Sequence, residues 1–134
     1  MHSHNVFENP PAQPHDAVLE ILAVALSADA AAAAQFDAAS ALVGTALNDN
    51  DRGFIEQCCF TVAAKAEPGS QLLGLAGLCL GHAARRFGTL SSEAIALAES
   101  LAARAAHDPA DVDGRAIDGL DDIRHFLSRH GSHR

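Results

Sequence analysis

Residues 70–88 read SQLLGLAGLCLGHAARRFG, and this stretch decides the fold class. Its apolar side chains recur every three or four residues, which is the spacing of an amphipathic helix. Ser70 is a suitable N-cap at its beginning, and Gly88 is a suitable residue just past its end. The stretch therefore predicts a helix that begins after Ser70 and reaches Phe87.

The composition of the whole chain extends this prediction to the other segments. Alanine and leucine dominate, β-branched residues are sparse, and aromatic residues make up 4%, with neither Trp nor Tyr. Helix formers therefore prevail over strand formers throughout. At 134 residues the chain is expected to form a single all-α domain.

Polar and proline-containing breaks divide the chain into six expected helices. The breaks that interrupt the apolar pattern most clearly are residues 48–51, 67–69 and 107–109. The expected organisation is a flexible lead-in over 1–14, one helical domain over 15–129 and a polar tail over 130–134. Within that domain the first helix is expected to begin near His15, and the sixth to run from about Ala110 to Ser128.

An internal repeat groups these helices into pairs. A forward shift of 40 positions places the fourth helix on the sixth, with matching apolar and glycine positions. The matched pairs are Leu72 with Val112, Gly74 with Gly114, Ala76 with Ala116, Leu80 with Leu120 and Phe87 with Leu127. A two-helix period of this length is typical of HEAT-type α-solenoids. We therefore expect an all-α, short HEAT-like α-solenoid of about three helix pairs, although an unrepeated helical bundle would explain the amphipathic stripes equally well.

The charge balance restricts the class of partner. The net charge is −8, with only nine Lys and Arg residues and no basic cluster. Phosphate backbones and anionic membranes are bound by clustered basic side chains, so neither nucleic acid nor a membrane is an expected partner. A cationic protein is the natural electrostatic complement. The N-terminal residues lack the pattern of a signal peptide, so a cytoplasmic location is expected.

The sequence contains no recognisable catalytic or metal-binding motif. Cys58, Cys59 and Cys79 lie within apolar helical patterns, which is typical of buried free thiols. No Cys and His spacing on any expected helix suits a structural zinc site. A nucleophile elbow and a phosphate-binding glycine loop are both missing from the sequence. We therefore expect a protein that is not an enzyme and that uses no metal and no cofactor.

Two helices carry features that a simple core does not explain. The sixth expected helix has acids away from its apolar stripe, which is either a solvated face or an acidic docking patch. The fourth has a glycine stripe, which indicates close helix packing or a groove that a partner enters. The candidate partner-binding residues are Asp111, Asp118, Asp121, Asp122, Gly77, Gly81, His82 and Arg85. Gly114 is assigned to repeat packing by its match with Gly74, whereas Gly119 has no glycine counterpart.

A family resemblance rests on three stretches of the chain. These are HDPADVDGRA at 107–116 with GLDDI at 119–123, GLAGL at 74–78, and GHAAR at 81–85. Together they resemble small bacterial HEAT-like proteins over roughly residues 50–128. Such proteins occur as immunity partners of secreted antibacterial toxins, including contact-dependent growth inhibition systems.

The resemblance implies a cytoplasmic immunity protein that neutralises its cognate toxin by binding. The partner would be the toxin's C-terminal domain, cationic if it is a nuclease, and its active or substrate-binding surface would be occluded. Two alternatives stay open: a HEAT-like accessory or bilin-lyase-type subunit, with Cys79 or His82 as candidate catalytic groups, and a generic protein-interaction scaffold.

Overall fold

The computed structural model describes residues 12–131, and within this range the chain forms six α-helices and no strand. The helices are α1 His15–Ala25, α2 Ala32–Asn48, α3 Arg52–Lys65, α4 Gln71–Phe87, α5 Ser92–His107 and α6 Arg115–Gly131. The predicted all-α fold and the number of helices are confirmed. Most of the expected lead-in over 1–14 and part of the expected tail over 130–134 lie outside the described residues.

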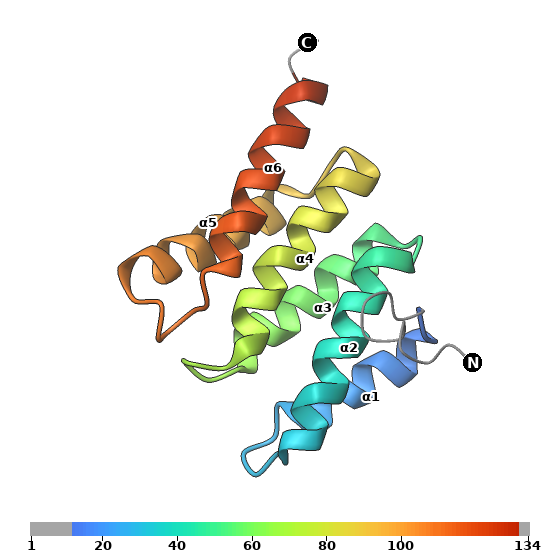
Figure 1. The fold of residues 1–134 in the computed structure, drawn as a ribbon. Coiled ribbons are helices and arrows are strands. Elements are labelled where there is room, and N and C mark those ends of the chain that lie inside the picture. The colour runs from blue at the N-terminus through green and yellow to red at the C-terminus, as the bar shows by residue number, and fades with distance from the viewer. Residues whose placement is uncertain (1–11, 132–134) are drawn as a thin grey trace, which may run out of the picture.

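The helices form two layers that run across three successive pairs (Figure 1). The odd-numbered helices contact one another in one layer, and the even-numbered helices contact one another in the second. Each pair packs only on the pair next to it, and α4 lies in the middle, against α2, α3, α5 and α6. This arrangement is a short solenoid-like bundle, in which each helix pair is stabilised by the pair beside it.

Local capping explains why α3 and α4 begin where the sequence predicts. Asp51 accepts a hydrogen bond from the N–H of Phe54, and Ser70 accepts one from the N–H of Leu72. Gly88 follows α4 with φ of 70°, a left-handed conformation that glycine adopts without steric cost. Because these caps involve residues close in sequence, the start of α3 and both ends of α4 could be predicted from the sequence.

The sixth helix begins five residues later than predicted, at Arg115 instead of Ala110. Its start is set by Asp113, whose carboxylate accepts a hydrogen bond of 2.9 Å from the N–H of Arg115. The 40-residue match nevertheless reports burial correctly, since Leu72 and Val112 are both fully buried. Val112, however, reaches the core from the loop before α6 and not from the helix.

The contact between α4 and α6 brings the two backbones together. A Cβ on Gly77 would lie 2.9 Å from Ala116, and a Cβ on Gly81 would lie 2.9 Å from the carbonyl oxygen of Gly119. A Cβ on Gly119 would in turn overlap the backbone of Gly77. By contrast, a Cβ on Gly114 would meet nothing within 4 Å. The packing role predicted for Gly114 was therefore wrong, and Gly119 performs it because it faces α4.

A buried carboxylate joins the second and third helix pairs. Glu56 of α3 has only 6% of its surface exposed. It accepts hydrogen bonds from the backbone N–H of Ser91, over 3.0 Å, and from the Ser91 hydroxyl, over 2.7 Å. Ser91 Oγ also accepts a hydrogen bond from the N–H of Ala94 and so caps α5. Glu56 therefore fixes the beginning of α5 against α3.

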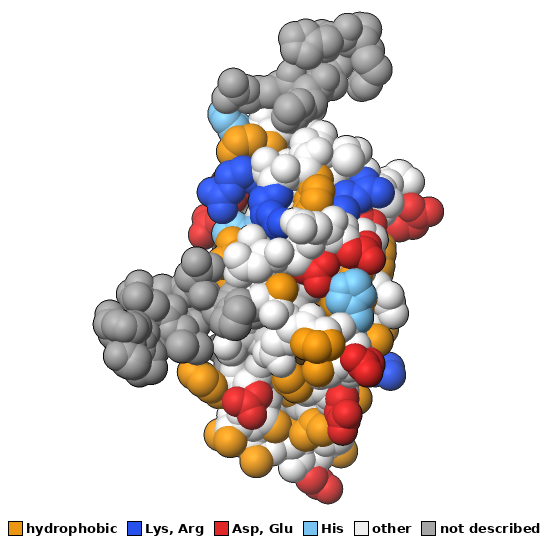
Figure 2. Space-filling model, turned by 90° about the vertical axis from the view of Figure 1, so that its right-hand side faces the viewer, with side chains coloured by type: hydrophobic (Ala, Val, Ile, Leu, Met, Phe, Trp, Pro, Cys, Tyr) orange, Lys and Arg blue, Asp and Glu red, His pale blue; other side chains and the backbone are white. Residues whose placement is uncertain are grey.

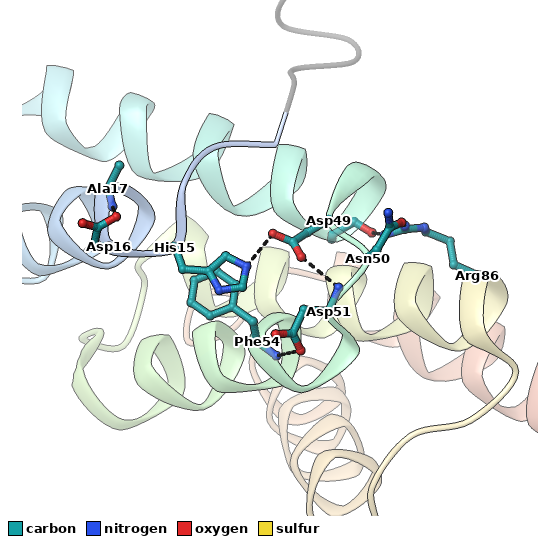
Figure 3. A network of polar contacts seen from close by, with 9 residues as sticks. His15, Asp16, Ala17, Asp49, Asn50, Asp51, Phe54 and Arg86 are labelled. Carbon is teal, nitrogen blue, oxygen red and sulfur yellow. Dashed lines mark hydrogen bonds and ion pairs between the residues drawn. The ribbon is translucent and has the colours of Figure 1, made fainter.

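The turn between α2 and α3 is held by residues from two other helices (Figure 3). His15, at the start of α1, bonds Asp49 through Nε2 over 2.8 Å and stacks on the ring of Phe54 at 3.6 Å between centroids. From the end of α4, Arg86 donates a hydrogen bond of 2.8 Å to the carbonyl oxygen of Ala46. These contacts tie the first pair of helices to the second at one end of the stack.

The three cysteines lie in the core as free thiols, as predicted. Burial raises the pKa of the Cys58 and Cys79 thiols to about 12. The Cys79 thiol lies 3.8 Å from the carbonyl oxygen of Leu42 in α2. Because the thiolate is the reactive form, these side chains are held in their unreactive state.

Thr45 of α2 allows the cost of an unsatisfied polar group in the core to be tested. It is fully buried, and among the described residues its hydroxyl is the buried side-chain oxygen without a hydrogen-bond partner. Valine has nearly the same shape and removes the unsatisfied group, so Thr45→Val is expected to stabilise the protein by about 1 kcal/mol. Urea unfolding of the variant and the parent measures this change. A less stable variant would show that the hydroxyl finds a partner, such as a buried water.

Candidate functional site

Side chains of α4 and α6 meet along the edge of their glycine contact. A Cβ on Gly81 would lie 3.2 Å from the Cβ of Asp122, so the acid borders the α4 backbone. Next to Gly81 in the chain, His82 accepts a hydrogen bond from Arg85 at Nδ1 over 2.9 Å. The structure thus brings three of the predicted site residues, His82, Arg85 and Asp122, to one place.

The protonation state of His82 follows from these neighbours. Burial of the ring lowers its pKa, the Arg85 guanidinium lowers it further, and Asp122 acts in the opposite direction. Since Arg85 has only donors, Nδ1 is the acceptor and the neutral ring carries its proton on Nε2. His82 therefore offers an N–H donor beside an exposed guanidinium and a carboxylate.

The acids of α6 form the exposed part of this region. Asp118 and Asp121 are exposed, and Asp122 is half-buried. The described ion pairs use other carboxylates, those of Asp49, Glu56, Asp111 and Asp113. We call Asp118, Asp121 and Asp122 with His82 and Arg85 the α4–α6 face.

Asp111 does not belong to the α4–α6 face, which corrects its predicted place on the sixth helix. It lies in the loop before α6, where Arg104 of α5 grips its carboxylate with two hydrogen bonds of 2.9 and 2.7 Å. The hydrogen bonds from Arg104 lower the pKa of Asp111. Its carbonyl oxygen accepts a hydrogen bond of 2.7 Å from the N–H of Gly69. This bond joins the loop between α5 and α6 to the loop between α3 and α4. Asp111 is thus a structural residue.

Gly77 and Gly81 are not accessible to a partner either. Both are buried, and α6 occupies the space in front of them. The prediction that a partner enters at these two glycines was wrong, because a neighbouring helix fills the stripe. Cys79, a candidate group of the alternative lyase hypothesis, is fully buried as well.

The described residues contain no cluster of three or more His, Cys, Asp or Glu side chains that could hold a metal ion. None of the helices in the described range combines the length and the apolar character that a bilayer-spanning segment needs.

In the comparisons with known proteins, no family model, no curated protein and no solved structure matches this chain.

The distribution of charge along the chain is a signal that the sequence analysis missed. Residues 1–51 contain seven Asp or Glu and no Lys or Arg, whereas residues 52–134 contain ten acids and nine bases. Nearly all of the net charge of −8 therefore belongs to the segment that includes the first helix pair. The acids of α6, in contrast, share their part of the chain with arginines.

Proposed function

We propose that the protein is a non-enzymatic immunity protein that binds the cytotoxic domain of a secreted antibacterial toxin and occludes its active or substrate-binding surface. The observation that carries the proposal is the α4–α6 face, where the carboxylates of α6 lie beside His82 and Arg85 of α4 and the two helices are in backbone contact. A rigid acidic surface suits a cationic partner, because little conformational entropy is lost on binding.

The polar groups of the face support recognition by hydrogen bonds. Arg85 offers donors to a carboxylate or carbonyl group of the partner, and Asp118 and Asp122 offer acceptors to its Lys and Arg side chains. Electrostatic complementarity of this kind raises association rates and rejects partners of the wrong charge. A toxin that acts on nucleic acid needs a basic substrate surface, which an acidic protein can cover.

Reversal of two charges tests this proposal. The double variant Asp118→Lys, Asp122→Lys is expected to weaken toxin binding by about tenfold or more and to leave cells sensitive to the toxin. The proposal predicts that a secreted toxin is encoded beside this protein, and the C-terminal domain of that toxin is the partner to use. The measurements are titration calorimetry and growth under toxin expression.

The matched control makes the same change of net charge elsewhere. Glu67 and Glu99 are exposed residues of the α3–α4 loop and of α5, so Glu67→Lys, Glu99→Lys is expected to keep its affinity and protection. If the α6 variant binds the toxin domain as tightly as this control does, the α4–α6 face is not the docking surface.

A further inference from the structure

We propose that the groove between α1 and α2 is a second docking site, which takes a cationic amphipathic segment of a partner protein. The inference rests on the proposed function only for the identity of that partner. The groove's shape and charge are a separate observation and can be tested without a toxin.

The groove is apolar inside and acidic at its edges. Its volume is about 330 Å³, and its lining residues are Ala17, Glu20, Ile21, Val24, Ala34 and Asp37. The two charged residues among them, Glu20 of α1 and Asp37 of α2, are both acidic and both exposed. An apolar side chain can therefore enter between the helices while Lys or Arg on the same segment pairs with the carboxylates.

Val24 marks the groove as an unusual surface. It is 53% exposed, and it lies on the outermost helix of the stack, since among the six described helices α1 contacts only α2 and α3. Terminal pairs of helical solenoids normally present a polar outer face to water. An apolar groove at this position is therefore better explained as a contact surface than as a cap.

The charge of the first helix pair decides what kind of occupant fits. Figure 2 shows hydrophobic and acidic side chains together over α1 and α2, whereas Lys and Arg gather toward the end at which α4 terminates. Residues 1–51 carry seven acids and no Lys or Arg. A second copy of this chain would bring two such acidic surfaces together, and like charges oppose that contact. A cationic partner meets no such repulsion.

Synthetic peptides test the groove directly. A helical amphipathic peptide made of Lys and Leu is expected to bind the protein, and its affinity should fall as salt is raised, because exposed charges are screened. A Lys and Ser peptide, which lacks the apolar anchor, and a Glu and Leu peptide, which lacks the complementary charge, are both expected to bind at least about tenfold more weakly. Fluorescence anisotropy of labelled peptides measures the three affinities.

Variants locate the binding. Glu20→Lys, Asp37→Lys is expected to weaken the Lys and Leu peptide by about tenfold or more, whereas the control Glu67→Lys, Glu99→Lys changes it by less than about threefold. Val24→Ser is expected to weaken it as well, whereas Ile117→Ser, at an exposed isoleucine of α6, does not. Equal effects in groove and control variants would overturn the proposal.

Two other occupants would give distinct results. A dimer in sedimentation equilibrium that Val24→Ser dissociates would assign the groove to a second copy. Tighter peptide binding after deletion of residues 1–11 would assign it to the chain's own N-terminal segment. Either result overturns the proposal. If the toxin domain binds but the groove variants leave peptide affinity unchanged, this inference fails and the proposed function stands. If the peptide binds in the groove but the toxin domain does not bind, the proposed function fails and this inference stands.

Discussion

Replacement of Gly119 by alanine is expected to destabilise the protein by at least about 3 kcal/mol, although alanine is the better helix former. The added Cβ would overlap the carbonyl oxygen of Gly77 and lie 2.6 Å from its carbonyl carbon. It would also lie 2.9 Å from the Cα of Leu78. These neighbours are backbone atoms and cannot move aside as a side chain can. The variant must therefore separate α6 from α4, and α4 is the centre of the fold.

Urea unfolding followed by circular dichroism measures the loss, and Gly114→Ala is the matched control. Gly114 lies one residue before α6, has no positive φ and faces open space. Its replacement is expected to change stability by less than about 0.5 kcal/mol. If Gly119→Ala were as stable as Gly114→Ala, the close approach of α4 and α6 would not exist in solution.

Removal of the Glu56 carboxylate is expected to cost about 2 to 3 kcal/mol. Glu56→Ala leaves the N–H and hydroxyl of Ser91 without their acceptor in a half-buried site. It also removes a negative charge from the N-terminus of α5, where the helix dipole favours one. Arg52, whose Nε lies 3.7 Å from the Glu56 carboxylate, loses its partner as well.

Two variants separate these contributions. Glu56→Gln keeps an oxygen acceptor but not the charge, so its stability is expected to fall between those of the parent and the alanine variant. Glu99→Ala, at an exposed position of α5, is expected to have little effect. Thermal and urea unfolding measure the stabilities of the two variants. A stability of Glu56→Ala equal to that of Glu99→Ala would mean that Ser91 alone fixes the beginning of α5.

The sequence predicted well those features that depend on neighbours along the chain. The boundaries of α4 follow from Ser70 and Gly88, and the start of α3 follows from Asp51, because each cap acts within a few residues. The shift by 40 positions also matched buried with buried residues, such as Leu80 with Leu120. The start of α6 was predicted wrongly because the carboxylate of Asp113 caps the helix at Arg115, and the 40-residue match does not predict a cap at this position.

The candidate site was predicted only in part, for a related reason. Asp118, Asp121 and Asp122 lie on an outward face of α6, as the helical spacing suggests. For Gly77 and Gly81 the sequence left close helix packing and a groove for a partner both open, because a small residue looks the same in sequence whether solvent or a helix lies in front of it. The acidic edges of the groove, Glu20 and Asp37, were overlooked because they lie on different helices.

The sequence by itself determined the helices and their apolar faces, since caps, breaks and periodicity are local properties of the chain. Only the tertiary structure decided which glycine serves the packing of α4 on α6, because that depends on which residue faces the other backbone. It also decided that Asp111 pairs with Arg104 and that Glu56 holds Ser91 from 35 residues away. Such pairings depend on distances that the fold creates, and the order of residues does not contain them.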